Sequence, residues 1–355
     1  MRHLLTACAL LLSLTAAPAA AAPAAAAPAD TATRAGLADA AAPAKVATPA
    51  GAMAAAPAIS STVTETWRGP RTLDLAWYSA NVGDKVDVRL LLPKTWKRST
   101  RKTWPVVFAL QGGRDDYTSW TRETDIEGLS GRWDVMVVMP TGGVNGSYTD
   151  WWNDGKGGPP RWETFHTQEL VNVLKTYHAG DRRAVIGASS GGQGAMAYAA
   201  RHHGMFRYAA SFSGSNHLTM DGMQAFLVTV NLLGFGMDAF RIFGVPGRDD
   251  ASWRAHDPYH LAPGLRGVGL YVSSGTTGMN GPYTPPGAQW RLTQLSEILV
   301  GQMNRSFVAR LNQLKIPVTT HIYGDGWHAW PEWIPELHKA WPLMMKALDA
   351  KGTMA

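Results

Sequence analysis

The chain has almost no cysteine. Its single one, Cys8, lies within an apolar N-terminal run of the 355-residue sequence. The rest of the chain can therefore form no disulfide bond, cysteine nucleophile or cysteine-based zinc site. Its stability has to come from an ordinary hydrophobic core, and the roughly 295 residues that follow the N-terminal region are ample for one.

The chain also lacks the charge pattern of a nucleic-acid-binding protein and any long apolar segment beyond its N-terminus. The formal net charge is +6, but the basic residues are scattered, and their one cluster, residues 94–102, falls in a predicted loop. No later stretch of about 20 residues is apolar enough to span a membrane. We therefore expect neither a nucleic-acid partner nor a transmembrane segment.

The first 60 residues are typical of an exported protein rather than of a folded domain. A short basic start at Met1–His3 precedes an apolar run over residues 4–16 and an Ala/Pro-rich stretch with Ala-x-Ala sites. This pattern predicts a secretory signal peptide over residues 1–27. The low-complexity sequence of residues 28–60 cannot form a core, so we expect a disordered linker there. The predicted location is therefore secreted, extracellular or cell-envelope associated.

From residue 61 onward, short apolar runs alternate with helical patterns. Residues 72–92 predict an opening antiparallel hairpin, because β-rich segments surround a turn at residues 81–84. Buried continuous strands that alternate with helices indicate an α/β fold with a mostly parallel central sheet and helices on both faces. The predicted strands are residues 105–110, 135–139, 184–186, 208–213, 269–273 and 318–323, and the predicted helices are residues 167–177, 192–203, 289–314 and 335–348.

Residues 217–266 interrupt this alternation. The stretch is rich in glycine, methionine and phenylalanine, and it contains Pro246, Pro258 and Pro263. We interpret it as an insertion in a domain of residues 61–355. It is either a cap beside the functional site or a plain surface excursion.

The most informative segment is a Gly-x-Ser-x-Gly sequence at residues 187–191, between an apolar run and a helical pattern. A serine at the apex of such a strand–turn–helix elbow has an exposed hydroxyl, and small neighbours leave room for the sharp turn. The next amide, that of Ser190, begins the helix, where N–H groups are unpaired and can stabilise an oxyanion. Ser189 is therefore our candidate nucleophile for acyl transfer.

A serine nucleophile needs a histidine base and an acid that orients it, in the chain order Ser, Asp/Glu, His for this architecture. His328 lies in a glycine-containing loop just beyond the last predicted strand, where an imidazole can reach the edge of the sheet. Glu297 is the only carboxylate between residues 274 and 317, where the acid is expected. Asp325 is the alternative, although its place three residues before His328 favours a turn residue.

The second donor of an oxyanion hole is expected in the loop after an earlier central strand. Gln111-Gly112-Gly113 follows the strand predicted over residues 105–110. Its glycines allow the backbone to approach a tetrahedral intermediate closely. We predict that the N–H groups of Gly113 and Ser190 form the oxyanion hole.

Several segments together resemble the mycobacterial antigen 85 mycolyltransferases. In order, they are the loop at residues 110–120, Ser147-Tyr148-Thr149-Asp150-Trp151-Trp152, Arg161-Trp162-Glu163-Thr164-Phe165, the elbow at Ser189, and His328-Ala329-Trp330-Pro331-Glu332-Trp333. The resemblance implies an α/β-hydrolase fold, a Ser189–Glu297–His328 triad and acyl transfer between sugars. Matching Asn304 and Phe307 to that group's Asn-x-x-Phe also places its catalytic acid on Glu297.

The resemblance also suggests which residues bind substrate. Arg114 and Trp330 lie at positions that contact sugar in that group, and Gln111 stands where the family has an aspartate that contacts trehalose. A neutral amide would hold a sugar hydroxyl less strongly than a carboxylate does. Trp327 is a further candidate, because flat aromatic faces suit sugar rings and acyl chains.

We therefore predict a secreted serine esterase or acyltransferase that acts through an acyl-enzyme on carboxylic esters or glycolipids, with a sugar hydroxyl such as that of trehalose as a candidate acceptor. Two alternatives stay open: a plain short-chain carboxylesterase, which Gln111 favours, and a non-catalytic protein of the same fold that binds the envelope or matrix. We expect no cofactor and no metal. His256 and His260 have the spacing of a helical zinc pair, but Pro258 between them disfavours a helix.

Overall fold

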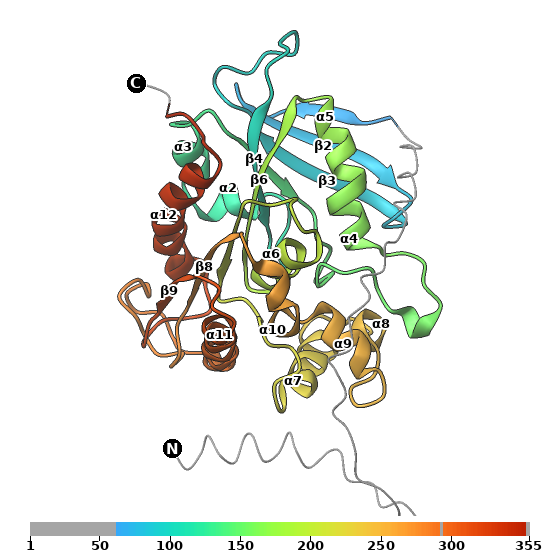
Figure 1. The fold of residues 1–355 in the computed structure, drawn as a ribbon, viewed down its shortest axis with the longest axis vertical. Helices are drawn as coiled ribbons and strands as arrows, with labels where there is room; N and C mark the ends of the chain where they lie inside the picture. The colour runs from blue at the N-terminus through green and yellow to red at the C-terminus, as the bar shows by residue number, and fades with distance from the viewer. Residues whose placement is uncertain (1–61, 292–293, 353–355) are drawn as a thin grey trace, which may run out of the picture. The chain divides into compact units, whose positions relative to one another are not determined.

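The computed structural model describes residues 62–291 and 294–352. The predicted signal peptide and linker lie outside these residues. The described chain forms one nine-stranded sheet with the order β1-β2-β3-β5-β4-β6-β7-β8-β9 (Figure 1). The strands are β1 (Thr64–Trp67), β2 (Thr72–Ser79), β3 (Asp84–Leu91), β4 (Trp104–Leu110), β5 (Met136–Pro140), β6 (Ala179–Ala188), β7 (Tyr208–Phe212), β8 (Gly269–Ser274) and β9 (Thr319–Ile322).

The sheet is mostly parallel, as predicted. Its first three neighbour pairs are antiparallel, which includes the expected hairpin of β2 and β3. The other five pairs, from β5 to β9, are parallel. Every residue of β4, β5 and β7 is buried, because helices cover both faces of a parallel sheet. β6 begins five residues before the predicted strand, since its first half is polar and only partly buried.

Helices cover the two faces of the sheet and bury a separate apolar cluster on each (Figure 1). One face carries α2 (Ser119–Glu123), α3 (Ile126–Ser130) and α12 (Trp330–Ala347), and the other carries α4 (Trp162–Thr164), α5 (Leu170–Lys175), α6 (Ser190–Arg201) and α11 (Leu295–Gln313). A π-helical turn (Phe165–Glu169) joins α4 to α5. α12 begins five residues before the predicted helix, because a proline is tolerated in the first turn. None of the described helices is long and apolar enough to cross a lipid bilayer.

Residues 217–266, which we call the cap segment, lie between β7 and β8. They contain α7 (Met223–Thr229), a π-helical turn (Val230–Gly234), α8 (Phe240–Phe243), α9 (Asp250–His256), α10 (Pro258–Leu261) and a 3-10 turn (Ala262–Leu265). The cap segment has a small apolar cluster of its own, built from Leu218, Ile242, Phe243 and Trp253. A second small cluster joins it to α11.

Candidate active site

The carboxyl ends of the parallel strands bring the candidate site residues together. β4 is followed by the loop that contains Gly113, β6 by Ser189, and β9 by the loop that contains His328. Glu297 lies in the first turn of α11, between β8 and β9. Residues that are far apart in the sequence thus meet at one edge of the sheet, where open α/β folds bind their ligands.

Ser189 occupies a strained turn between β6 and α6. Its φ of 55° and ψ of −125° lie in a region that residues with side chains rarely adopt. The Ser189 backbone N–H donates to the carbonyl of Phe212 at 2.9 Å, which holds the turn against β7. A Cβ on Gly191 would lie 2.5 Å from the carbonyl oxygens of Leu110 and Gln111. Backbone crowding therefore explains why position 191, two residues after the serine, is a glycine.

Ser189, His328 and Glu297 form one hydrogen-bonded chain. Ser189 Oγ lies 2.8 Å from His328 Nε2, and His328 Nδ1 lies 2.6 Å from Glu297 Oε2. When Nδ1–H donates to the carboxylate, the lone pair on Nε2 is free to accept the serine proton. The His328 side chain is 15% exposed and the Glu297 side chain is fully buried, so the imidazole reaches the surface while its carboxylate partner does not.

The Glu297 carboxylate is held by groups that sequence reasoning missed. Its Oε1 accepts hydrogen bonds from Ser213 Oγ at 2.8 Å and from the Gly275 N–H at 2.6 Å. Trp333 Nε1–H in turn donates to Ser213 Oγ at 3.0 Å. Both carboxylate oxygens therefore have donors, as a buried charge requires. Ser213 and Gly275 directly follow β7 and β8, and this position was the signal that could have found them.

Asp325, the alternative acid, has a different partner. It accepts a hydrogen bond from Thr277 Oγ1 at 2.7 Å. The backbone N–H of His328 donates to Gln294 Oε1 at 2.9 Å, which further sets the direction of its loop. Asp325 therefore behaves as a loop residue, and Glu297 is the carboxylate in contact with the imidazole.

The two predicted oxyanion donors flank Ser189. Gly113 lines the same cleft as Ser189 and His328, and Ser190 is the first residue of α6. The loop approaches the nucleophile closely, since a Cβ on Gly112 would lie 3.4 Å from Ser189 Cβ. Within the described residues, the Gly113 and Ser190 N–H groups have no hydrogen-bond acceptor. Both amides are therefore available to a ligand.

Gln111 does not face the cleft. It is 2% exposed. Its Nε2 donates to the carbonyls of Asp115 at 2.5 Å and Gly143 at 2.9 Å, and its Oε1 accepts from the Gly142 N–H at 3.2 Å. These bonds use both amide N–H groups and one lone pair of the amide oxygen, so the buried Gln111 side chain has a structural role. It joins the loop after β4 to the loop after β5.

Of the other predicted substrate contacts, Trp330 is the one that lines the cleft. Trp327 is buried, with 8% of its surface exposed. Arg114 is exposed, but its guanidinium donates to the carbonyl of Gly234 and lies 5.6 Å from the centroid of the Phe235 ring. Arg114 therefore fastens the loop after β4 to the cap segment.

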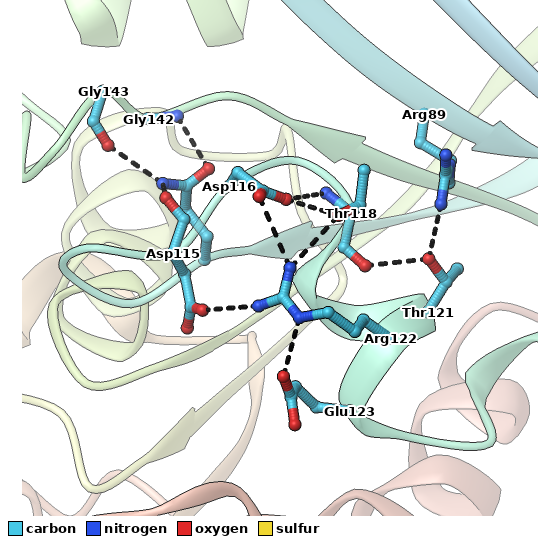
Figure 2. Close-up of polar contacts among 10 residues, drawn as sticks. Arg89, Asp115, Asp116, Thr118, Thr121, Arg122, Glu123, Gly142 and Gly143 are labelled. Atoms are coloured by element: carbon cyan, nitrogen blue, oxygen red, sulfur yellow. Dashed lines mark hydrogen bonds and ion pairs between the residues drawn. The ribbon is translucent and has the colours of Figure 1, made fainter.

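The cleft beside Ser189 has a volume of about 370 Å³ and combines an aromatic wall with carboxylates. Trp330 packs edge-to-face on Trp120 at 4.9 Å and on Trp333 at 5.3 Å. Asp115 and Glu123 also line the cleft, and the Arg122 guanidinium joins them at 3.1 Å and 2.7 Å (Figure 2). Burial raises the pKa of the Asp115 carboxyl, although the charge of Arg122 opposes the shift.

The fold and the site geometry are those of an α/β-hydrolase. The Putative esterase family matches residues 79–344, so the chain belongs to that family. Among curated proteins, Esterase Rv1288 of Mycobacterium tuberculosis is 30% identical over 264 residues, which cover 72% of this chain and 56% of that protein. The chain therefore spans about half the length of this relative.

The resemblance to the antigen 85 group is confirmed as well. The diacylglycerol acyltransferase/mycolyltransferase Ag85B of Mycobacterium leprae is 29% identical over 265 residues, which cover 69% of this chain and 77% of that protein. The solved structure of MPT51 (FbpC1) from Mycobacterium tuberculosis shares the fold with a TM-score of 0.60 and 23% identity over 77% of this chain and 97% of that one. An S-formylglutathione hydrolase from Agrobacterium tumefaciens has the same TM-score of 0.60 at 15% identity, over 81% and 99% of the two chains.

Proposed function

We propose that this protein is a secreted serine esterase or acyltransferase that acts on carboxylic esters through an acyl-enzyme. The observation that carries the proposal is the contact chain from Ser189 Oγ through His328 to Glu297, at a cleft with two unpaired backbone N–H groups. The named esterase and acyltransferase activities of the relatives support the same reaction class. The N-terminal sequence supports export.

In the first half of the reaction, Ser189 Oγ attacks the ester carbonyl carbon while His328 Nε2 takes the serine proton. Glu297 accepts the Nδ1–H bond and stabilises the imidazolium that forms. The Gly113 and Ser190 N–H groups donate to the oxyanion of the tetrahedral intermediate. His328 then gives its proton to the leaving alcohol, and the acyl group stays on Ser189.

In the second half, a hydroxyl replaces the alcohol that has left. Its proton passes to His328 Nε2 as its oxygen attacks the acyl carbon, and the same two amides stabilise the second oxyanion. Collapse of the intermediate returns the proton to Ser189 Oγ. Water as the attacking group makes the protein an esterase, and a sugar hydroxyl makes it an acyltransferase.

Transfer to a sugar hydroxyl is the second candidate, and two features of the cleft favour it. Trp330 offers an aromatic face that suits a sugar ring, and Asp115 offers a carboxylate acceptor for hydroxyl groups. Asp115 lies four residues after Gln111, whose amide is buried. In this proposal Asp115 binds the acceptor, and Gln111 holds the loop that carries it.

The decisive experiment compares wild type with Ser189→Ala and with Ser99→Ala, a control that removes an exposed serine hydroxyl elsewhere. Hydrolysis of p-nitrophenyl esters of increasing acyl length is measured with and without trehalose, and the products are identified by mass spectrometry. A fluorophosphonate probe labels activated serines independently of the choice of ester. We expect Ser189→Ala to lose activity by at least about 10³-fold and to lose the label, while the control keeps both.

The products separate the two candidate reactions. Free acid alone indicates an esterase, and acylated sugar in the trehalose samples indicates an acyltransferase. Wild-type protein that hydrolyses no ester and takes up no probe would contradict catalysis and leave the binding-protein alternative. Activity that survives Ser189→Ala would exclude Ser189 as the nucleophile.

A further inference from the structure

A second cluster of reactive side chains lies in the cap segment, outside the catalytic chain. One ring nitrogen of His217, one of His260 and a carboxylate oxygen of Asp257 all lie within 4.8 Å of one another. Asp257 is fully buried, and both histidines are partly exposed. Two imidazoles and one carboxylate are a frequent ligand set of Zn²⁺, with a fourth position for water. The catalytic mechanism uses none of these three residues.

Each ligand side chain is oriented by a neighbouring hydroxyl. His217 Nδ1 lies 2.8 Å from Ser306 Oγ, and His260 Nε2 lies 2.9 Å from Thr219 Oγ1. Thr219 Oγ1 also donates to Asp257 Oδ2 at 2.8 Å. These contacts occupy Nδ1 of His217 and Nε2 of His260, and among the described residues the other nitrogen of each ring has no hydrogen-bond partner. Metal-bound histidines in proteins are typically held by a second hydrogen bond of this kind.

The charge of Asp257 is not balanced by its hydrogen bonds. Its donors are the N–H and hydroxyl of Thr219 and the N–H of Tyr259, all of which are neutral. A fully buried carboxylate without a positive partner is costly. A divalent cation would supply the missing charge and use the lone pairs of both rings.

The donors have to move closer together to bind a small ion. Zn–N and Zn–O bonds of about 2.0–2.2 Å place tetrahedral donors about 3.4 Å apart. The donor atoms here lie within 4.8 Å of one another, and the two partly exposed imidazoles can bring them closer by rotating about their side-chain torsions. Asp221 contributes a further negative charge beside His217.

We propose that His217, Asp257 and His260 bind a divalent transition metal ion and that Zn²⁺ fits them best. His217 lies at the start of the cap segment and the other two residues lie near its end, so the ion would close this segment into a loop. Hydrogen bonds between Thr219 and Asp257 already span 38 positions of the sequence. An ion at this place stabilises the folded cap segment, because the unfolded chain offers no preformed site. Ser306 connects the site to α11, the helix that carries Glu297.

The test uses the full chain without a histidine tag, stripped with a chelator and then titrated with Zn²⁺ by calorimetry. We expect one Zn²⁺ per chain and a rise in Tm of about 5–10 °C at a free Zn²⁺ concentration of about 100 times Kd. His217→Gln and His260→Gln are expected to weaken Zn²⁺ binding at least about tenfold each. His256→Gln is the matched control, because His256 lies in the same segment but bonds to the carbonyl of Ser252 at 2.8 Å.

Cobalt gives an independent measurement on the wild-type chain. Co²⁺ at the site is expected to show the visible absorption of a tetrahedral ion with nitrogen and oxygen ligands, and this signal tests the proposal even where a variant fails to fold. Absence of stoichiometric Zn²⁺ binding and of this spectrum would overturn the site. Binding that is equal in wild type and in the His217→Gln and His260→Gln variants would overturn the ligand assignment. None of these readouts depends on catalysis, so they are separate from the test of the proposed function.

Discussion

The hydrolase core and the cap segment are stabilised in different ways. In the core, whole strands such as β4 and β7 are buried, and large apolar clusters cover both faces of the sheet. In the cap segment, helices of four to seven residues surround small apolar clusters, and Leu233 is 82% exposed. Ser189 and Glu297 therefore lie at the starts of helices that pack against the buried sheet, while the cap segment has fewer buried contacts and is expected to open more readily.

Besides their contacts at α11, the two regions meet at the loop after β4 and at α6. Phe235 of the cap segment lies so close to Gly113 that a Cβ on this glycine would be 2.7 Å from Phe235 Cζ. On α6, the Arg201 guanidinium donates to the carbonyl of Ala255 at 2.7 Å. Movements of the cap segment can therefore reach the oxyanion loop through a few specific contacts, and these contacts can be tested one at a time.

The largest expected effect is a fall in kcat on changing Glu297 in the hydrolase core. Glu297→Gln keeps the volume of the side chain but removes its charge and disfavours the Nδ1–H tautomer of His328. We expect kcat for p-nitrophenyl acetate to fall by about 10³–10⁴-fold, or about 4–5 kcal/mol of transition-state stabilisation. Glu127→Gln, which changes an exposed glutamate on α3, is the control and should keep full activity. A loss of less than tenfold in Glu297→Gln would show that this carboxylate does not orient the base.

The second-largest expected effect is on the free energy of unfolding, and it depends on pH. It involves Glu163, whose partner Arg201 also contacts Ala255 of the cap segment. Burial alone would raise the pKa of the Glu163 carboxyl, but contacts with His202 at 2.7 Å and Arg201 at 2.8 Å lower it to about 2. A carboxyl whose folded pKa is lowered contributes stability above its unfolded pKa of about 4.5, and this contribution is lost as the pH falls towards 2. The shift corresponds to about 3 kcal/mol.

Urea unfolding of wild type and Glu163→Gln at several pH values measures this contribution. We expect the free energy of unfolding of wild type to exceed that of the variant by about 3 kcal/mol at pH 7. This difference should shrink as the pH falls from about 5 to about 2. A difference in the free energy of unfolding that stays constant with pH would contradict the ion-pair explanation. Asp181→Asn, at an almost fully exposed carboxylate, provides the surface comparison.

A smaller effect is expected from Gln111→Ala, which acts inside the core. The change removes the partner of one buried and two partly buried backbone groups and should destabilise the fold by about 2 kcal/mol. If Gln111 holds the loop, kcat falls for every ester and acceptor while KM changes little. A rise in KM confined to sugar acceptors would instead support the predicted substrate contact. Gln302→Ala, at an exposed position of α11, controls for loss of an amide.

The smallest expected effect is a fall in kcat caused by changing the contact between Gly113 in the loop after β4 and Phe235 in the cap segment. Gly113→Ala places a methyl group against the tip of the Phe235 ring, which has to shift by a few tenths of an ångström or more. We expect kcat to fall by about tenfold, equivalent to about 1.4 kcal/mol. Because Phe235→Ala removes the obstacle, the double variant should regain most of the activity, and kcat/KM of all four proteins measures the coupling. Equal losses in the single and double variants would mean that the methyl group harms the oxyanion loop directly.

Sequence patterns predicted the core far better than the cap segment. The apolar runs that become β4, β5 and β7 are buried on both faces, so their composition alone marks them as central strands. The cap segment has no such periodicity, since its short helices bury only a few residues each, and its helices were not predicted. The first half of β6 was also not predicted, because it is polar and only partly buried and therefore contains no apolar run.

The sequence by itself determined the candidate catalytic residues and their order along the chain: a serine on a glycine-flanked elbow, an isolated glutamate, and a histidine beyond the last strand. These signals are local, because a sharp turn or a buried strand restricts the residues at each of its own positions. Only the tertiary structure decided which side chains meet. It buries Gln111 between two loops, supports Glu297 with Ser213 and Trp333, and places His217 beside His260 rather than leaving His260 with His256. Such contacts depend on how distant elements pack, and no single stretch of sequence contains that information.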